Sequence, residues 1–227
     1  MTFTAIVPVR GGSKGLVGKN LRPLAGTPLW RRAVDQALAA GAARVVVTTD
    51  IREILDGSAL PEVECLERPD KLAEDSTPMA PVVVHAIEAQ AITGRVVLLQ
   101  PTSPLRLVSD ISAGVERLVD PSVDLVMSVT ETDPGVLKYG TLEGGMFIPL
   151  ANPEFPFTNR QSLPPVFRPN GAVYTFDANW FVANGGFATD RIAALVMPAE
   201  RSHDIDTLAD FERAEAIITA SGARADR

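Results

Sequence analysis

The chain has 227 residues, of which 46% are hydrophobic, and it carries 21 Lys and Arg against 28 Asp and Glu for a formal charge of −7. This length and apolar fraction suit one core, so we expect a single domain over residues 1–220 and a disordered tail over residues 221–227. The acidic balance gives no reason to expect nucleic acid or an anionic membrane as a partner, and the single cysteine excludes an intrachain disulfide and a thiolate metal cluster.

The predicted elements alternate between strands and helices. Apolar runs predict strands at residues 4–9, 44–48, 63–66, 95–99, 124–129, 172–176 and 192–197. Helical spacing of apolar residues covers residues 29–38, 82–91, 111–118 and 207–218, the last with Thr207 as its N-cap. No leader-like pattern precedes the first strand and no apolar run reaches the length of a membrane span, so we expect a cytoplasmic protein with no membrane partner.

This alternation predicts an α/β fold with a mostly parallel sheet covered by helices on both faces. In such folds, ligands lie beyond the carboxyl ends of the strands. Arg10, Asp50 and Gln100 each follow directly from a predicted strand. We therefore expect these three residues to converge on one site.

The first strand leads into the sequence R-G-G-S-K-G-L-V-G-K-N, residues 10–20. Its glycines let backbone N–H groups turn towards a ligand, and its three cations, Arg10, Lys14 and Lys19, favour a polyphosphate. The loop is not a Walker loop, because Ser13 stands at the first glycine position and Asn20 replaces the metal-binding hydroxyl. It contains no G-x-G-x-x-G either. The alternative is a flexible surface loop.

Residues 131–168 lose the regular alternation and are rich in Gly, Pro and aromatic residues. A structureless segment of this length inside a compact domain is uncommon unless it has a function. Its apolar content indicates that it is buried against another surface.

Asp204 and Asp206 are separated by a single residue, Ile205. In an extended segment both carboxylates point to one side while Ile205 packs inward, an arrangement that suits Mg²⁺. The alternative is that the pair only caps the last helix. The neighbouring His203 is interpreted as a solvated side chain, and a histidine-based metal site is improbable with two histidines in the chain.

The sequence Q-P-T-S-P-L-R, residues 100–106, follows the strand at residues 95–99. Its two prolines fix the backbone, so the polar side chains are presented on a rigid turn that suits an oxygen-rich ligand. The alternative is a purely structural turn that leads into the next helix.

These motifs, taken in order with Arg68-Pro69, Arg160-Gln161, R-P-N-G at residues 168–171 and D-I-D-T at residues 204–207, resemble those of the acylneuraminate cytidylyltransferases. The resemblance extends from about residue 3 to residue 218. It implies a Rossmann-like nucleotidyltransferase fold of the glycosyltransferase A type. It also implies a Mg²⁺-dependent reaction in which a nonulosonic acid of the sialic acid type and CTP give a CMP-sugar and pyrophosphate.

The resemblance also assigns residues. For CTP these are Arg10, Gly11, Gly12, Ser13, Lys14, Lys19, Asn20 and Arg68. For the sugar acid they are Gln100, Lys138, Arg160, Asn170, Tyr174 and Phe187. Arg10, Lys14, Asp204 and Asp206 are the implied catalytic residues, with the metal on the last two.

In the resembled family, residues matching 131–168 form a homodimer contact, and those matching Lys138 and Arg160 enter the partner's active site. We therefore expect a homodimer with shared active sites. Two departures from the family pattern affect the pockets. Ala188 stands where a second aromatic residue follows Phe187, and Pro78, Met79 and Pro81 replace small hydroxyl residues.

Three alternatives stay open. Two of them are enzymes, one acting on another sugar acid, such as legionaminate, and one using another nucleotide. A third possibility is a catalytically silent nucleotide-sugar binder, although pure binding does not require two clustered carboxylates.

Overall fold

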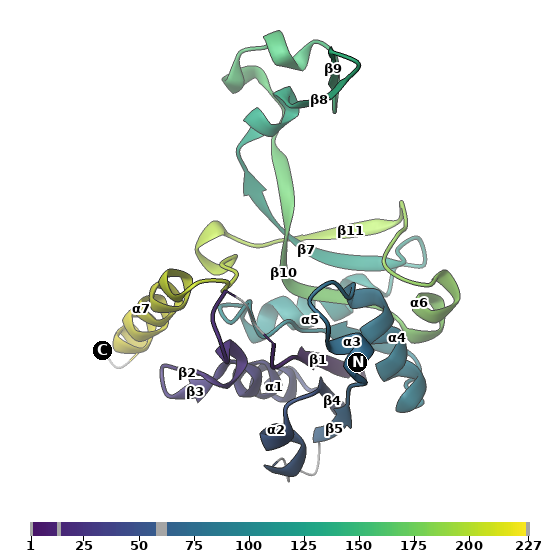
Figure 1. Cartoon of the computed structure of the whole chain (residues 1–227), viewed down its shortest axis with the longest axis vertical. Coiled ribbons are helices and arrows are strands. Elements are labelled where there is room, and N and C mark those ends of the chain that lie inside the picture. Colours follow the sequence, from purple (N-terminus) through teal and green to yellow (C-terminus); the bar gives the residue numbers. More distant parts are fainter. Residues whose placement is uncertain (1, 13–14, 58–62, 226–227) are drawn as a thin grey trace.

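The computed structural model describes residues 2–12, 15–57 and 63–225. Seven of the described strands form one sheet, in the order β11-β7-β10-β6-β1-β4-β5 (Figure 1). They are β1 (Thr4–Val9), β4 (Arg44–Thr49), β5 (Val63–Glu67), β6 (Arg95–Leu98), β7 (Leu125–Thr132), β10 (Val166–Asp177) and β11 (Ile192–Val196). All neighbouring pairs are parallel except those of β10, which runs antiparallel to both β6 and β7. The predicted α/β fold with a mostly parallel sheet is confirmed.

Helices cover both faces of this sheet. The core on one face includes buried residues of α1 (Leu29–Ala39) and α5 (Val108–Arg117). The core on the other face includes those of α4 (Met79–Ala89) and α6 (Ala178–Asn184). Successive strand residues alternate between the two cores, as Val45 and Val47 do against Val46, because side chains of a strand point to opposite faces.

The smaller elements frame one end of the sheet. They are β2 (Pro23–Leu24), β3 (Thr27–Pro28), α2 (Arg52–Gly57), α3 (Asp70–Ala73), η1 (Lys19–Leu21) and η5 (Ala199–Arg201). The last helix, α7 (Leu208–Ala225), buries Phe211 and Ala214 in a third core with Leu24 and Ile205. The hydroxyl of Thr207 accepts a hydrogen bond from the backbone N–H of Asp210 at 3.2 Å, which confirms Thr207 as the cap.

Two strands continue beyond the sheet into a projecting arm (Figure 1). The arm holds the hairpin of β8 (Gly140–Glu143) and β9 (Met146–Pro149), with η2 (Pro134–Lys138), η3 (Phe155–Phe157) and η4 (Arg160–Ser162). Between its strands lie Gly144 and Gly145, both at positive φ (56° and 84°), as a tight hairpin turn requires. The segment predicted to lack regular structure therefore contains a hairpin and three short helical turns.

Two ends of elements differ from the prediction. β10 begins at Val166, six residues before the predicted start at residue 172. α7 continues through Ala225, into the tail that was predicted to be disordered from residue 221. Among the helices that the structure describes, none has the length and hydrophobicity needed to cross a membrane.

Candidate active-site cleft

The carboxyl ends of four parallel strands meet at one edge of the sheet. Arg10 follows β1, Asp50 follows β4, Arg68 follows β5, and Gln100 lies two residues after β6. A cavity of about 200 Å³ opens there. It is lined by Pro8, Arg10, Lys19, Asn20, Arg68, Met79, Gln100, Pro101 and Thr102. The cleft lies where ligands bind in open parallel sheets.

The start of the glycine-rich loop is held from two sides. The backbone N–H of Gly11 donates to Oδ1 of Asp50 at 2.9 Å, and Nδ2 of Asn20 donates to the carbonyl of Arg10 at 2.9 Å. Asn20 is buried. These bonds fix the direction in which the loop leaves β1. Gly12 is exposed, and Ser13 and Lys14 lie outside the described residues.

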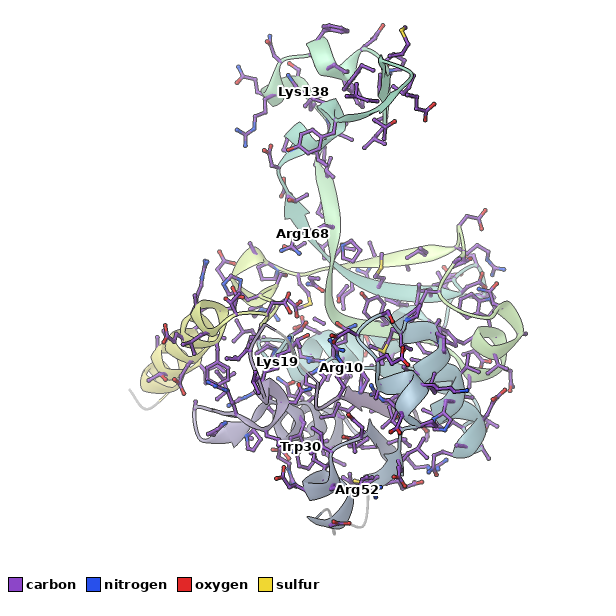
Figure 2. The ribbon with its side chains drawn as sticks, viewed as in Figure 1. Arg10, Lys19, Trp30, Arg52, Lys138 and Arg168 are labelled. Carbon is purple, nitrogen blue, oxygen red and sulfur yellow. The ribbon has the colours of Figure 1, made fainter. Side chains whose placement is uncertain are left out.

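Two cations of this loop are paired with carboxylates of other segments, and both lie at the centre of the molecule (Figure 2). The guanidinium of Arg10 bonds Asp75, which lies between α3 and α4. Nζ of Lys19 donates to the carbonyl of Ile205 at 2.7 Å and to Oδ1 of Asp206 at 3.0 Å. Lys19 therefore joins the glycine-rich loop to the segment that carries the predicted metal carboxylates.

A third cation, Arg68, is buried at the wall of the cavity, with 4% of its surface exposed. Its Nη2 donates to the carbonyl of Thr48 at 2.8 Å. Burial lowers the pKa of Arg68 to about 10; the nearby Asp50 opposes this shift and the positive charge of Arg10 adds to it. A buried cation beside a second cation gains from an anionic ligand, which a triphosphate supplies.

Asp204 and Asp206 flank a fully buried Ile205, and both are exposed at the cleft edge, as the alternation predicted. Desolvation of its carboxyl group raises the pKa of Asp204, and the negative charge of Asp206 raises it further, while hydrogen bonding to Thr102 and the charge of Lys19 oppose the shift. The helix cap itself is made by Thr207 and Asp210. The side chain of Asp206 instead bonds Lys19.

This donor set fits Mg²⁺, which prefers a few carboxylate oxygens supplemented by phosphate oxygens and water. Asp204 and Asp206 are the residues that would hold the ion. Among the described residues, no group of three or more His, Cys, Asp or Glu side chains gathers as a metal site.

The turn after β6 lines the cleft, and β10 lies directly against this turn. A β-carbon built on Gly171 would lie 2.7 Å from Oε1 of Gln100, so the carboxamide of Gln100 lies against this part of β10. Tyr174 packs on Phe187 with ring centroids 5.6 Å apart. Burial raises the pKa of Tyr174, and the negative charge of Asp204 raises it further.

Asn170 is buried, and its amide is used within the protein. Its Nδ2 donates to Oγ of Ser202 at 2.8 Å, and its Oδ1 accepts from Oγ of Ser128 at 2.6 Å. Asn170 therefore ties β10 to the segment before Asp204, and its predicted contact with the sugar stays a prediction.

Lys138 and Arg160 lie on the arm. Nε of Arg160 donates to Oδ1 of Asp133 at 2.9 Å, beside η2, in which Lys138 is the last residue. Figure 2 shows Lys138 far from Arg10 and Lys19. Within one chain the structure does not bring these two residues to the cleft.

Asp75 was not predicted from the sequence as the partner of Arg10, because it lies in a stretch with no periodic pattern. Its acidic side chain near the ends of the strands is the one signal in the sequence that could have indicated it. A larger cavity, of about 540 Å³, lies at the opposite edge of the sheet, beside Phe3, Arg95 and Trp180. It contains none of the predicted site residues. Its size alone does not make it the functional site.

A model of the cytidylyltransferase family matches residues 4–141, which span the glycine-rich loop and the turn after β6. The chain belongs to this family. It is 31% identical over 214 residues to the N-acylneuraminate cytidylyltransferase of Streptococcus agalactiae serotype III, in a match that covers 91% of the chain and 51% of that protein. The chain therefore spans about half the length of this relative.

Another relative matches this chain over nearly the whole length of both proteins. The chain is 28% identical over 231 residues to the CMP-N,N'-diacetyllegionaminic acid synthase of Legionella pneumophila, which covers 96% of the chain and 97% of that protein. The solved structure of CMP:2-keto-3-deoxy-manno-octonic acid synthetase complexed with CTP matches with a TM-score of 0.71 and 16% identity, covering 97% of this chain and 100% of that one. The structural match confirms the nucleotidyltransferase fold predicted from the motifs.

Proposed function

We propose that this protein is a cytidylyltransferase that activates a nonulosonic acid with CTP. The anomeric hydroxyl oxygen of the acid attacks the α-phosphorus of CTP and loses its proton. A new carbon–oxygen–phosphorus linkage forms, the bond from the α-phosphorus to the bridging oxygen breaks, and pyrophosphate leaves. The observation that carries the proposal is the convergence of Arg10, Lys19 and Arg68 on one cavity that Gln100 and Thr102 also line.

The positive charges of the glycine-rich loop indicate where in the cleft the triphosphate binds. Arg10 and Lys19 belong to the glycine-rich loop, and Lys14, in the same loop, is proposed to act with them. Phosphoryl transfer needs little covalent work from a protein, because positioning and charge neutralisation supply most of the rate. Arg10 bonds Asp75 and Lys19 bonds Asp206, so a bound triphosphate would compete with these carboxylates for the two cations.

Asp204 and Asp206 are proposed to hold Mg²⁺. When bound, the ion neutralises phosphate charge and lowers the pKa of the attacking hydroxyl. The repulsion between the two carboxylates supports this assignment, because a cation between them would relieve it. Gln100 and Tyr174 are proposed to orient the sugar acid, and Phe187 packs against Tyr174.

We further propose that the working unit is a homodimer. The arm exposes large apolar side chains, with Phe157 90% and Leu142 77% exposed. A projecting apolar surface of this kind is typical of a protein interface. Lys138 and Arg160 lie on the same arm, so a partner's arm would supply the two cations that the cleft of one chain does not contain.

Two activating reactions are distinguished by one assay. Pyrophosphate release is measured with CTP, UTP, ATP and GTP, each with N-acetylneuraminate or N,N'-diacetyllegionaminate and with Mg²⁺. The proposal expects release with CTP that depends on one of the two acids. The full-length match to the legionaminic acid relative is the reason to include the second acid. A protein that binds CTP but releases no pyrophosphate with either acid would instead be the silent binder.

A further inference from the structure

Arg106, the last residue of the turn after β6, is buried with 2% of its surface exposed. Its guanidinium donates to three backbone carbonyls. Nε donates to Ser103 at 3.0 Å, Nη1 donates to Ala172 at 2.8 Å, and Nη2 donates to Gln100. Two of these carbonyls belong to the turn and the third to β10. One side chain therefore holds together the two segments that form the sugar end of the cleft.

Burying the charged guanidinium of Arg106 carries a desolvation cost. Burial lowers the pKa of Arg106 to about 9, and the nearby carboxylate of Asp110 only partly opposes the shift. An apolar side chain would avoid this desolvation. The planar guanidinium donates to these carbonyls from three separate nitrogens in a fixed arrangement, whereas the three donors of a lysine ammonium all lie on one nitrogen at the end of a flexible stem.

The backbone of β10 near Arg106 departs from regular strand pairing and lies close to the turn after β6. The pairing of β10 with β7 shifts between Pro169 and Tyr174, and Gly171 lies within that shift at a φ of +75°. The carboxamide of Gln100 lies against Gly171, as the 2.7 Å approach of a built β-carbon shows. The carbonyl that Arg106 holds on β10 is the one directly after this glycine.

A second contact fastens the same two segments. Oγ of Ser103 donates to the carbonyl of Asn170 at 3.2 Å, and Ser103 is buried. The turn also holds the carboxylate segment, because the N–H of Ile205 donates to the carbonyl of Thr102 at 2.8 Å. The spacing between Gln100 and Tyr174 is therefore set largely by Arg106 and Ser103, neither of which lines the cavity.

We propose that Arg106 is a positioning residue that fixes Gln100 relative to Tyr174 and thereby determines the affinity for the sugar acid. It acts through its three carbonyl contacts, since it does not line the cavity. The glycine-rich loop is held instead by Asp50 and Asn20. The inference rests on the proposed function and assigns Arg106 to the sugar-acid half of that site alone.

The test replaces Arg106 by lysine, which keeps the charge and loses the fork. The affinity for CTP is measured by calorimetry, and KM for the better of N-acetylneuraminate and N,N'-diacetyllegionaminate is measured at saturating CTP. We expect KM for the acid to rise about tenfold, as for the loss of one good hydrogen bond, while the dissociation constant of CTP changes less than about twofold.

The matched control is Arg32→Lys on α1. Arg32 is also an arginine whose pKa is lowered by burial, and its Nη2 donates to the carbonyl of Leu24 at 2.8 Å, away from the cleft lining. This variant should lose stability to urea without a change in KM for the acid. A rise in KM for Arg106→Lys that Arg32→Lys matches at equal loss of stability would contradict the proposal.

Ser103→Ala provides a milder variant that carries the test if Arg106→Lys does not fold. It should raise KM for the acid in the same direction and by less, again with CTP affinity unchanged. Unchanged KM for the acid in the folded variants would overturn the inference, as would an equal loss of CTP affinity. Failure of the unaltered protein to bind CTP or to use either acid would instead overturn the proposed function.

Discussion

At the scale of single residues, the cleft keeps its charges paired within the protein. Arg10 bonds Asp75, Lys19 bonds Asp206, and the buried Arg68 lies near Asp50. These partners come from segments far apart in the sequence. An anionic ligand would therefore exchange with carboxylates that already lie on the cations, which favours binding of a highly charged triphosphate over a neutral ligand.

Replacing Arg10 by alanine should weaken CTP binding and lower turnover together. The change removes a charge-assisted contact of about 1.5–3 kcal/mol, or about 10- to 150-fold in affinity. Calorimetry with CTP and pyrophosphate release measure the two effects. Arg52→Ala, which removes an exposed arginine paired with Glu67, is the control and should leave both unchanged. An Arg10→Ala protein with the CTP affinity of the unaltered protein would contradict the role of the loop.

The raised pKa of the Asp204 carboxyl predicts that the free energy of unfolding depends on pH. Because the fold raises the pKa of this carboxyl, the folded state holds its proton to higher pH than the unfolded state, and ionisation at neutral pH destabilises the fold. Asp204→Asn should therefore raise the free energy of unfolding at neutral pH without divalent cations. The gain should vanish as pH falls below the ordinary range of an aspartate carboxyl, where both states are protonated.

Urea unfolding from neutral to acidic pH measures this difference, with Asp56→Asn on α2 as an exposed control. Adding Mg²⁺ at neutral pH should stabilise the unaltered protein more than Asp204→Asn, because a bound ion adds to the stability of the folded state. A variant that is less stable than the unaltered protein at neutral pH would show that Asp204 is not under electrostatic strain.

At the scale of elements, the glycine-rich loop contacts the carboxylate segment directly. A β-carbon built on Gly15 would lie 2.4 Å from the carbonyl oxygen of Asp206. Backbone atoms cannot yield as a flexible side chain does, so a larger residue at this position must displace one segment. The closeness of these two segments is what brings the proposed phosphate and metal sites together.

Gly15→Ala should therefore lower turnover by about 10- to 100-fold, the size of effect expected when reacting groups shift by about 1 Å. Affinity for CTP should fall with it. Gly57→Ala at the end of α2 is the control, because a β-carbon there meets nothing within 4 Å. Kinetics of the two variants that do not differ would show that the loop tolerates displacement from Asp206.

The same scale shows what the sequence could predict. The two-sided burial of runs such as Val45, Val46 and Val47 makes central strands visible, and the C-terminal edge of a parallel sheet then predicts that Arg10, Asp50 and Gln100 meet. The apolar pattern does not indicate the direction in which a strand runs. β10 has the apolar pattern of another buried strand, yet it runs antiparallel to both neighbours. Its extension towards the arm was not predicted because residues 166–169 are exposed or partly exposed and form no buried apolar run.

Side-chain partners were predicted less well than positions. The R-P-N-G motif placed Asn170 near the cleft, but the structure turns its amide towards Ser128 and Ser202. Arg106 is the last residue of the Q-P-T-S-P-L-R motif, and the sequence pattern does not indicate that its side chain bonds the backbone of β10. Such contacts depend on where a strand shifts register, which only the assembled sheet determines.

At the scale of the whole molecule, the arm separates the proposed sugar-binding cations from the cleft. Lys138 lies in the arm, far from Arg10 and Lys19 in the body of the molecule (Figure 2), and Arg160 bonds Asp133 beside the same η2 turn. The arm adds exposed apolar side chains to an otherwise acidic chain. A symmetric dimer would place each arm on the partner and complete both sites at once.

Mixing two inactive variants should therefore restore activity. Asp206→Asn disables its own cleft, and Arg160→Ala disables the cleft of its partner, so a mixed dimer keeps one intact site. An equal mixture at exchange equilibrium should recover about one quarter of full activity, because half of the dimers are mixed and each keeps one of two sites.

The control mixes Asp206→Asn with Arg10→Ala, two changes that fall in each subunit's own cleft and leave no site intact. That mixture should stay at the level of its components. A monomeric mass in solution, or verified mixed dimers of the first pair that remain inactive, would refute the shared site.

The central claim is that this cleft transfers the cytidylyl group of CTP to a sugar acid. The most direct measurement follows a phosphorus label placed in the α or the γ position of CTP during turnover with N-acetylneuraminate and with N,N'-diacetyllegionaminate. The account predicts that the α label appears in a CMP-sugar, that the γ label appears in pyrophosphate, and that Asp206→Asn abolishes both. An α label that stays in CTP, or that is released as CMP without any sugar acid, would contradict it.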